Sequence, residues 1–384
     1  MKYGFLFFCC LIGWIHFYGQ NYAVAHRTIN FIDANRLNRV VPTELYYPGT
    51  ATGDNFPVVL DSAKFPVVCF AHGYLTPYSA YNWLADSLVK QGFIVAFPTT
   101  EGTAFPSHEQ LGRDIAFVTK TILALNDSAG SFLLGRVAQR SAVGGHSMGG
   151  GCSFLAMNYL PSINAIFNFC AAETTPSSKA AALLIQKPAL IFSGSADCIA
   201  RDSNQLTMYN NIPYSCKTYI NITGALHCQF ANNDVPCVSG QIFSFCNSTA
   251  VPLNTVTGKS ISFLIPFLNY YLKSSCNSGV QFENVYINST GVSKQRTCIQ
   301  DPFVCNETNN AAYIFNGSGN WSNAANWQNN RMPPDSLKRG AEIIINPINN
   351  SSSFLDRTQY ILVGARILVL NSKQLQVPGE LKIQ

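Results

Sequence analysis

AVGGHSMGGG occupies residues 142–151, and its glycines surround a single serine, Ser147. A short apolar run leads into Gly145-His146-Ser147-Met148-Gly149, and a stretch of helical period follows. G-x-S-x-G in this strand–turn–helix context is typical of a nucleophile elbow, in which flanking glycines allow a strained turn that exposes the serine Oγ. We therefore predict that Ser147 is a nucleophile. A phosphate-binding loop is the alternative, but the segment lacks the G-x-x-x-x-G-K-[ST] pattern.

Short apolar runs alternate with longer stretches of helical period between Arg36 and Leu272. This order predicts an α/β fold with a mostly parallel sheet and helices on both faces. The expected strands are 44–47, 67–71, 94–97, 142–144, 165–169, 189–193 and 218–222. The expected helices are 81–91, 109–126, 149–158 and 260–272, the last kinked at Pro266.

The composition excludes several classes of protein. The chain has 384 residues, 47% hydrophobic and 12% charged, which is enough for a substantial core and a smaller module. Its 25 Lys and Arg and 20 Asp and Glu residues give a net charge of +5, but the bases are scattered singly. This argues against nucleic acid as a partner, because a row of phosphates needs clustered bases. The apolar segment 5–18 is shorter than the roughly 20 residues that span a bilayer, which argues against integral membrane association.

Four segments are expected along the chain. Residues 1–20 have the charged start and apolar run of a signal peptide, so we expect export to the extracellular space, the cell surface or the periplasm. The mature chain should start between Asn21 and His26. Residues 21–275 form the predicted catalytic domain, 276–312 a linker rich in Cys, Asn and Ser, and 313–384 a small β-rich module, without a convincing internal repeat.

The cysteines fall into two groups. Cys9 and Cys10 belong to the signal peptide, and Cys69, Cys152 and Cys170 lie in apolar runs, where we expect buried free thiols. In an exported chain the other eight are predicted to form disulfides: Cys198, Cys216, Cys228, Cys237, Cys246, Cys276, Cys298 and Cys305. The local pairings are Cys198 with Cys216, and Cys228 with Cys237 or Cys246. A zinc site is the rival, but the paired Cys-x-x-Cys spacing is missing, so we expect no metal.

His227 is the candidate general base. His26 lies at the processed terminus, His72 and His146 belong to glycine-bearing turns, and His108 precedes the serine. His227 follows an expected strand and lies downstream of the serine, as the chain order Ser…Asp…His requires. A surface or capping histidine is the alternative interpretation.

Asp197 is the candidate acid that orients this histidine. It follows the expected strand 189–193 after a few small residues, and functional groups collect at the carboxyl ends of strands in open α/β sheets. Asp202 and Asp234 are poorer candidates because neither directly follows such a strand. A helix N-cap is a second role that Asp197 could fill at the same time.

Two backbone N–H groups are expected to form the oxyanion hole. One belongs to Met148, which follows the nucleophile, and the other to Tyr74, in the turn after the expected strand 67–71. We also expect the Tyr74 ring and the Met148 side chain to line the acyl pocket. An ordinary turn and simple packing are the alternatives.

Residues 36–272 resemble the α/β-hydrolase superfamily, and within it the secreted group of cutinase-like polyester hydrolases, platelet-activating-factor acetylhydrolase-like enzymes and chlorophyllases. The matching features are RVVPTELYYP at 39–48, His72-Gly73-Tyr74, the elbow at 145–151, Asp197 and His227. Tyr74 and Met148 reproduce the aromatic residue after His-Gly and the methionine after serine of the polyester hydrolases.

One departure from this group concerns substrate choice. Where polyester hydrolases carry a tryptophan that clamps an aromatic acid, this chain has CAAET at 170–174, which argues against specificity for aromatic polyesters. Glu173 there either lines the substrate cleft or caps a helix. In the tail, residues 316–334 resemble β-rich surface modules of secreted Bacteroidetes proteins. Trp321 and Trp327 either stack on a polymer or sugar at a cell surface or anchor a small β core, and we favour the core.

Together these residues predict a secreted serine carboxylic-ester hydrolase that needs no cofactor and works through an acyl-enzyme. Only 50 residues separate Ser147 from Asp197 and 30 separate Asp197 from His227, so we expect an open cleft without a lid. Such a cleft would accept polyester, cutin-like or lipid esters. The alternatives are a serine peptidase or amidase of the same fold, and a non-catalytic adhesion or binding protein on a hydrolase scaffold.

Overall fold

The computed structural model describes residues 21–61, 63–214, 216–244, 250–298, 312–337, 341–349, 351–361 and 365–383. The predicted signal peptide, Cys246, Cys305 and residues 299–311 of the predicted linker lie outside these ranges, as do the side chains of Cys276 and Cys298. Among the helices within these ranges, none combines the length and the apolar character needed to cross a bilayer.

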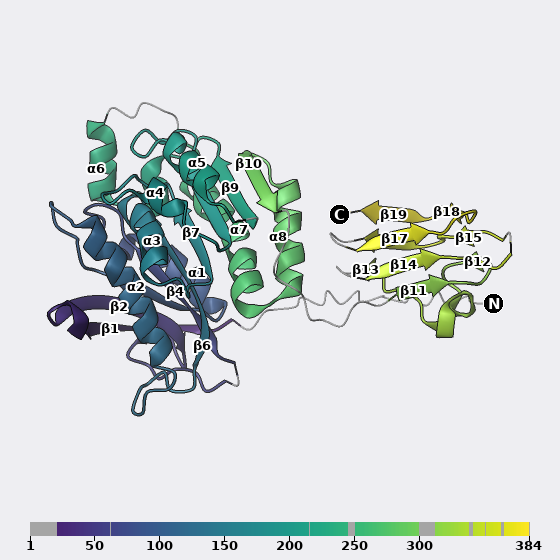
Figure 1. Cartoon of the computed structure of the whole chain (residues 1–384), viewed down its shortest axis with the longest axis horizontal. Coiled ribbons are helices and arrows are strands. Elements are labelled where there is room, and N and C mark those ends of the chain that lie inside the picture. The colour runs from purple at the N-terminus through teal and green to yellow at the C-terminus, as the bar shows by residue number, and fades with distance from the viewer. Residues whose placement is uncertain are drawn as a thin grey trace, which may run out of the picture.

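A ten-stranded sheet forms the first part of the chain (Figure 1), in the order β10-β9-β8-β7-β6-β4-β5-β2-β1-β3. Strands β4 to β9 are parallel, whereas β2 pairs antiparallel with β1 and β5, and β10 pairs antiparallel with β9. The strands are β1 Ala23–Asp33, β2 Arg39–Gly49, β3 Gly53–Asp54, β4 Phe65–Ala71, β5 Ile94–Pro98, β6 Val137–His146, β7 Ala165–Phe169, β8 Ala189–Gly194, β9 Cys216–Ile222 and β10 Val292–Cys298.

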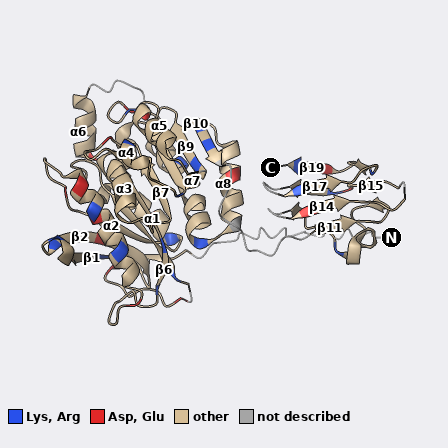
Figure 2. Cartoon of the chain, in the orientation of Figure 1, with Lys and Arg blue, Asp and Glu red and all other residues tan. Residues whose placement is uncertain are grey.

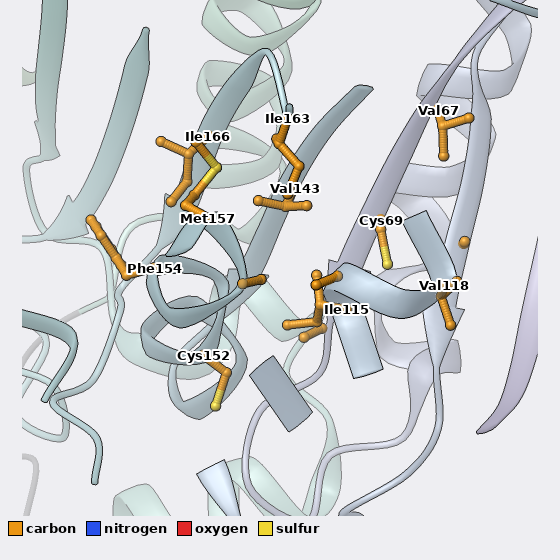
Figure 3. Packing of buried hydrophobic residues seen from close by; sticks show 14 of the residues in the cluster. Val67, Cys69, Ile115, Val118, Val143, Cys152, Phe154, Met157, Ile163 and Ile166 are labelled. Atoms are coloured by element: carbon orange, nitrogen blue, oxygen red, sulfur yellow. The ribbon is translucent and has the colours of Figure 1, made fainter. Parts of the chain in front are cut away.

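Helices cover both faces of this sheet, which is why the central strands β4, β5, β7 and β8 are buried along their whole length. One core packs under α2, α3, α4 and α5, and the other under α1, α7 and α8. The helices are α1 Asn82–Lys90, α2 His108–Ala124, α3 Met148–Tyr159, α4 Ser178–Ala182, α5 Asp202–Asn211, α6 Val235–Phe243, α7 Leu253–Lys273 and α8 Cys276–Asn288. Figure 3 shows Cys69 and Cys152 in the first core, among aliphatic side chains.

The predicted α/β architecture with a small β-rich module is confirmed. Each of the seven expected strands lies in an observed strand, and the four expected helices correspond to α1, α2, α3 and α7, with the first two expected to be one or two residues longer than α1 and α2 are. The prediction of a linker from residue 276 is wrong for residues 276–298. These residues form α8, which buries Phe282 against Phe263 and Phe267 of α7, and the edge strand β10. Their composition resembles that of a linker because α8 exposes Asn277, Gln281 and Asn288, and β10 carries Lys294 and Arg296, as protected edge strands often do.

The module after residue 311 consists of three parallel three-stranded sheets. Their strands follow in rotation, so each coil of the chain adds one strand to each sheet, as in a β-solenoid. The strands are β11 Ala312–Phe315, β12 Gly319–Asn320, β13 Ser336–Leu337, β14 Glu342–Ile345, β15 Ser353–Phe354, β16 Thr358–Ile361, β17 Arg366–Val369, β18 Leu375–Gln376 and β19 Glu380–Ile383.

The sequence shows no convincing internal repeat, yet the structure of this module repeats. Glu342 pairs with Arg366, 24 positions later, whereas Ala312 pairs with Glu342, 30 positions later. Two 3-10 turns, Ala324–Asn326 and Gln328–Asn330, lengthen that first coil and shift the period. The strands are only two to four residues long and lie between turns rich in Asn and Ser. Their repeated apolar pattern is therefore too weak to be recognised in the sequence once the period changes.

Trp321 and Trp327 anchor the core of this module. Both are buried, and their rings pack edge to face with centroids 5.2 Å apart. Trp321 Nε1 donates to Ser353 Oγ at 2.6 Å, and Trp327 Nε1 donates to the Trp321 carbonyl at 2.9 Å. These contacts support the core interpretation and leave neither ring available for stacking on a polymer.

Truncation tests the revised boundary at residue 298. A chain that ends at residue 298 should keep the melting temperature of the sheet domain, whereas one that ends at residue 275 should melt several degrees lower. The shorter chain loses the burial of Phe282, worth about 1.5–3 kcal/mol, and the ladder partner of β9. Calorimetry of both chains measures the difference, and equal melting temperatures would contradict the boundary.

Candidate active site

Ser147 occupies a strained turn between β6 and α3. Its φ of 53° and ψ of −118° are rare for a residue with a Cβ atom. The turn is this tight because glycines surround it: a Cβ on Gly145 would lie 2.2 Å from the Gly149 carbonyl carbon, and one on Gly149 would lie 2.3 Å from the Ala71 oxygen. The sequence motif thus produces the backbone geometry expected of a nucleophile elbow.

His227 and Asp197 meet at the same edge of the sheet. Asp197 follows β8, and His227 begins the 3-10 helix His227–Ala231 after β9. His227 Nδ1 lies 2.7 Å from Asp197 Oδ2, and both side chains are buried. The other carboxylate oxygen, Oδ1, accepts the N–H groups of Ile199 at 2.8 Å and Ala200 at 3.0 Å. The carboxylate is therefore fixed on both sides, and its charge favours a proton on Nδ1, which leaves Nε2 free to accept one.

Ser147 and His227 line one small pocket of about 100 Å³. Its other walls come from the turn after β4, from the loop that follows Asp197, and from α6. The lining residues are Gly73, Tyr74, Thr76, His146, Ser147, Ile199, His227, Pro236, Cys237 and Gly240. Ser147 and His227 thus line one pocket, and Asp197, outside the lining, is joined to it through its contact with His227.

The two amides predicted for an oxyanion hole also lie at this end of the sheet. Met148 is the first residue of α3, where a helix leaves its N–H without an intrahelical acceptor. Tyr74 lies in the turn after β4. This residue is 47% exposed and lines the pocket, and its hydroxyl donates to the Ala104 carbonyl. The N-terminus of α3 adds a favourable dipole for an anion.

Two predicted substrate contacts differ in the structure. The Met148 side chain is buried in the core under α3 and lies outside the pocket lining. Glu173 is exposed and also outside the pocket lining: its carboxylate accepts the Ser178 hydroxyl at 3.0 Å and the Lys179 N–H at 3.3 Å. Glu173 therefore caps α4, the second of the two roles considered for it.

One wall of the pocket is formed by α6, a helix that the expectation of a cleft without a lid did not include. Pro236, Cys237 and Gly240 of this helix line the pocket, and Cys237 is joined to Cys228, next to His227, by a disulfide. Residues 235–243 carry no charged side chain, so α6 is tan throughout in Figure 2, and Val235, Ile242 and Phe243 are exposed. The expectation rested on the numbers of residues between Ser147, Asp197 and His227, and α6 follows His227, so those numbers did not include it.

The remaining described cysteines divide as follows. Cys198 and Cys216 are also disulfide-bonded, and Cys69, Cys152 and Cys170 are buried free thiols. Within the described part of the chain, the one cluster of three potential metal ligands is Cys170, Asp197 and His227. Burial raises the pKa of the Cys170 thiol well above its usual value, which disfavours the thiolate that metals bind. Asp197 and His227 are already hydrogen-bonded to each other through Asp197 Oδ2 and His227 Nδ1.

Sequence reasoning missed His146 and Tyr81. We assigned His146 only to a glycine-bearing turn, yet its buried ring lies with its centroid 4.5 Å from that of His227 and bonds to Tyr81. The available signal was a tyrosine in the turn between β4 and α1, and sequence spacing alone could not pair it with position 146.

Comparisons with known proteins agree with this geometry. A bis(hydroxyethyl) terephthalate hydrolase of Streptomyces coelicolor is 30% identical over 187 residues, 48% of this chain and 54% of that protein. Cutinase est1 and cutinase est2 of Thermobifida alba are each 28% identical over 176 residues, 45% of this chain and 56% and 55% of those proteins. The chain thus spans about half the length of the curated relatives it matches.

A family model gives the broader assignment. The model described as PET hydrolase-like matches residues 35–245, more than half of the 384-residue chain, and includes the elbow, Asp197 and His227. This protein therefore belongs to the PET hydrolase-like family, among the cutinase-like polyester hydrolases of the α/β-hydrolase superfamily.

Proposed function

We propose that this protein is a carboxylic-ester hydrolase in which Ser147 is the nucleophile, His227 the general base and Asp197 the residue that orients His227. The observation that supports this most is the 2.7 Å contact between His227 Nδ1 and Asp197 Oδ2 at the pocket that Ser147 lines. A serine hydroxyl needs such a base, and the base needs an acceptor that holds its tautomer.

In the first half of the reaction, His227 Nε2 takes the proton of Ser147 Oγ while Oγ bonds to the ester carbonyl carbon. The carbon–oxygen bond to the alcohol then breaks, and His227 gives the proton to the departing alcohol oxygen. In the second half, water loses a proton to His227 and attacks the acyl-serine. The acid leaves and the proton returns to Oγ, so the enzyme is restored.

Negative charge develops on the carbonyl oxygen in both halves. The N–H groups of Met148 and Tyr74 are the donors that we assign to it, since one opens α3 and the other follows the strand beside the elbow. Each such donor typically contributes about 10²–10³ in kcat.

For the substrate, we propose polyester, cutin-like or lipid esters whose acyl group enters the small pocket. The relatives named as a bis(hydroxyethyl) terephthalate hydrolase and as cutinases support this class. The half-exposed Tyr74 ring and Ile199 offer apolar contact beside Ser147, and the wall made by α6 limits the width of the acyl group. The absence of tryptophan from residues 170–174 argues against a strong preference for aromatic acids.

We also propose that the protein is exported. Cys228 and Cys237 form a disulfide with an S–S distance of 2.10 Å, and Cys198 and Cys216 are disulfide-bonded as well. Structural disulfides persist in oxidising compartments and are rare in reducing ones.

Replacement of the nucleophile tests the proposal. Ser147→Ala should lower kcat for p-nitrophenyl butyrate by about 10⁴–10⁶ without a change in fold, because alanine fits the turn but has no hydroxyl. Ser153→Ala is the matched control, since Ser153 is a buried serine of α3 that bonds the Gly150 carbonyl and lies outside the pocket lining. Near-normal turnover by Ser147→Ala would rule out this nucleophile, and faster hydrolysis of the matching anilide by the unaltered protein would favour an amidase.

The Cys228–Cys237 disulfide should matter for activity as well as for stability. Replacing both cysteines with alanine should cost about 2–4 kcal/mol of unfolding free energy. It should also lower kcat per folded molecule severalfold, because the bridge ties the wall helix α6 to the residue after His227. Activity is measured well below the melting temperature and divided by the folded fraction. A lower melting temperature with unchanged kcat would show that the bridge only stabilises the fold.

A further inference from the structure

A buried hydrogen-bonded chain runs behind the candidate active site, and it does not belong to the reaction proposed above. We infer that Tyr81 and His146 form a positioning pair that holds the Gly73–Tyr74 turn, the nucleophile elbow and the backbone of His227 in one fixed arrangement. The inference rests on the proposed function, because it concerns the alignment of that same site.

The chain of hydrogen bonds has one consistent direction. The Gly73 N–H donates to Tyr81 Oη at 3.0 Å, so this oxygen is an acceptor there. At the other end, His146 Nε2 lies 3.2 Å from the carbonyl oxygen of His227, which can only accept, so Nε2 carries the proton. His146 Nδ1 is then an acceptor in the neutral ring, and Tyr81 Oη donates to it at 2.9 Å.

Burial keeps both members of the pair neutral. His146 and Tyr81 are both 0% exposed. Burial, together with the neighbouring His227 ring, lowers the pKa of His146 well below its usual value. Burial raises the pKa of the Tyr81 hydroxyl, so it keeps the proton that it donates. His146 Nδ1 therefore stays an acceptor and the Tyr81 hydroxyl a donor, which fixes the directions of the hydrogen bonds.

Each end of this chain lies next to a reacting group. Gly73 precedes Tyr74, whose N–H we assign to the oxyanion hole. His146 precedes Ser147, and the acceptor at the far end is the main chain of His227 itself. The Tyr81 ring is held in place by Phe70 of β4 and Phe97 of β5, with ring centroids 5.0 and 6.5 Å away.

Such a pair affects catalysis by setting the distances between the groups that react. The oxyanion donor, the nucleophile and the base come from three separate segments, and a displacement of about 1 Å can cost on the order of 10² in rate. A fully satisfied buried polar network fixes one arrangement of its members, whereas apolar packing tolerates small shifts. Tyr81 lies outside the pocket lining and acts through the residues that react. His146 lines the pocket, but its two ring nitrogens are occupied by Tyr81 and by the His227 carbonyl, so it takes no part in the proton transfers.

Tyr81→Phe with Tyr47→Phe as the matched control tests the inference. Tyr47 is equally buried and donates to the Phe56 carbonyl at 2.8 Å, in a part of β2 outside the pocket lining. Each variant loses one buried hydroxyl, so we expect a comparable drop in melting temperature. Only Tyr81→Phe should lower kcat, by about tenfold or more, with KM within about twofold of the unaltered protein.

A second pair of variants separates the two bonds of His146. Glutamine can present an N–H near the position of Nε2 and so keep the bond to the His227 carbonyl, whereas phenylalanine keeps neither bond. We therefore expect His146→Gln to retain more kcat than His146→Phe, and phosphonylation of Ser147 by a p-nitrophenyl phosphonate to slow in the same order.

The outcomes distinguish this inference from the proposed function. If the unaltered protein neither hydrolyses esters nor reacts with the phosphonate, the proposed function fails. If it does both, but Tyr81→Phe loses no more kcat than Tyr47→Phe, the positioning pair is overturned while the proposed function stands. Equal loss in kcat by His146→Gln and His146→Phe, with no change in Tyr81→Phe, also overturns it.

Discussion

Ser147 keeps a backbone conformation that residues with a Cβ atom seldom adopt, with φ at 53°. Such a backbone conformation persists only where the surrounding structure fixes it. Here β6 precedes Ser147 and α3 follows it, and both are largely buried next to the turn. The Ser147 N–H donates to Phe169 at the end of β7, and its carbonyl accepts from Ala172 beyond that strand. The neighbouring strand thus clamps the turn from the side. Glycines at 145 and 149 are required because any Cβ there would collide with this packing.

The parallel sheet turns sequence order into spatial proximity. Ser147 follows β6, Asp197 follows β8 and His227 follows β9, and these strands lie within four neighbouring positions of the sheet. Because parallel strands present their carboxyl ends at one edge, residues 80 positions apart in the chain meet at a pocket of about 100 Å³. The disulfide at Cys228 and the two N–H donors to Asp197 then fix loops that the sheet alone would leave free.

Sequence reasoning succeeded where local pattern and tertiary role coincide. The strands of the buried sheet read as apolar runs because both faces are covered, and the elbow motif specifies its own turn. It failed where burial is partial. β10 is polar in composition, and α6 has no buried residue, so their placement depends on pairing or on a disulfide. The roles of Met148 and Glu173 depended on side-chain direction, which a motif does not encode. The pairing of Tyr81 with His146 spans 65 positions and required the fold itself.

The imidazole rings of His146 and His227 have centroids 4.5 Å apart, so positive charge on both rings would be repulsive. In the proposed reaction one of them gains a proton, and a second positive ring at that distance would oppose the transfer. The hydrogen-bond partners of the two rings differ, and this difference decides which ring takes the positive charge. His227 faces a carboxylate, which stabilises the imidazolium, whereas His146 has a hydroxyl donor on one nitrogen and a carbonyl acceptor on the other. Protonation of His146 Nδ1 would replace an acceptor by a second donor facing Tyr81, so the buried ring stays neutral and the proton goes to His227.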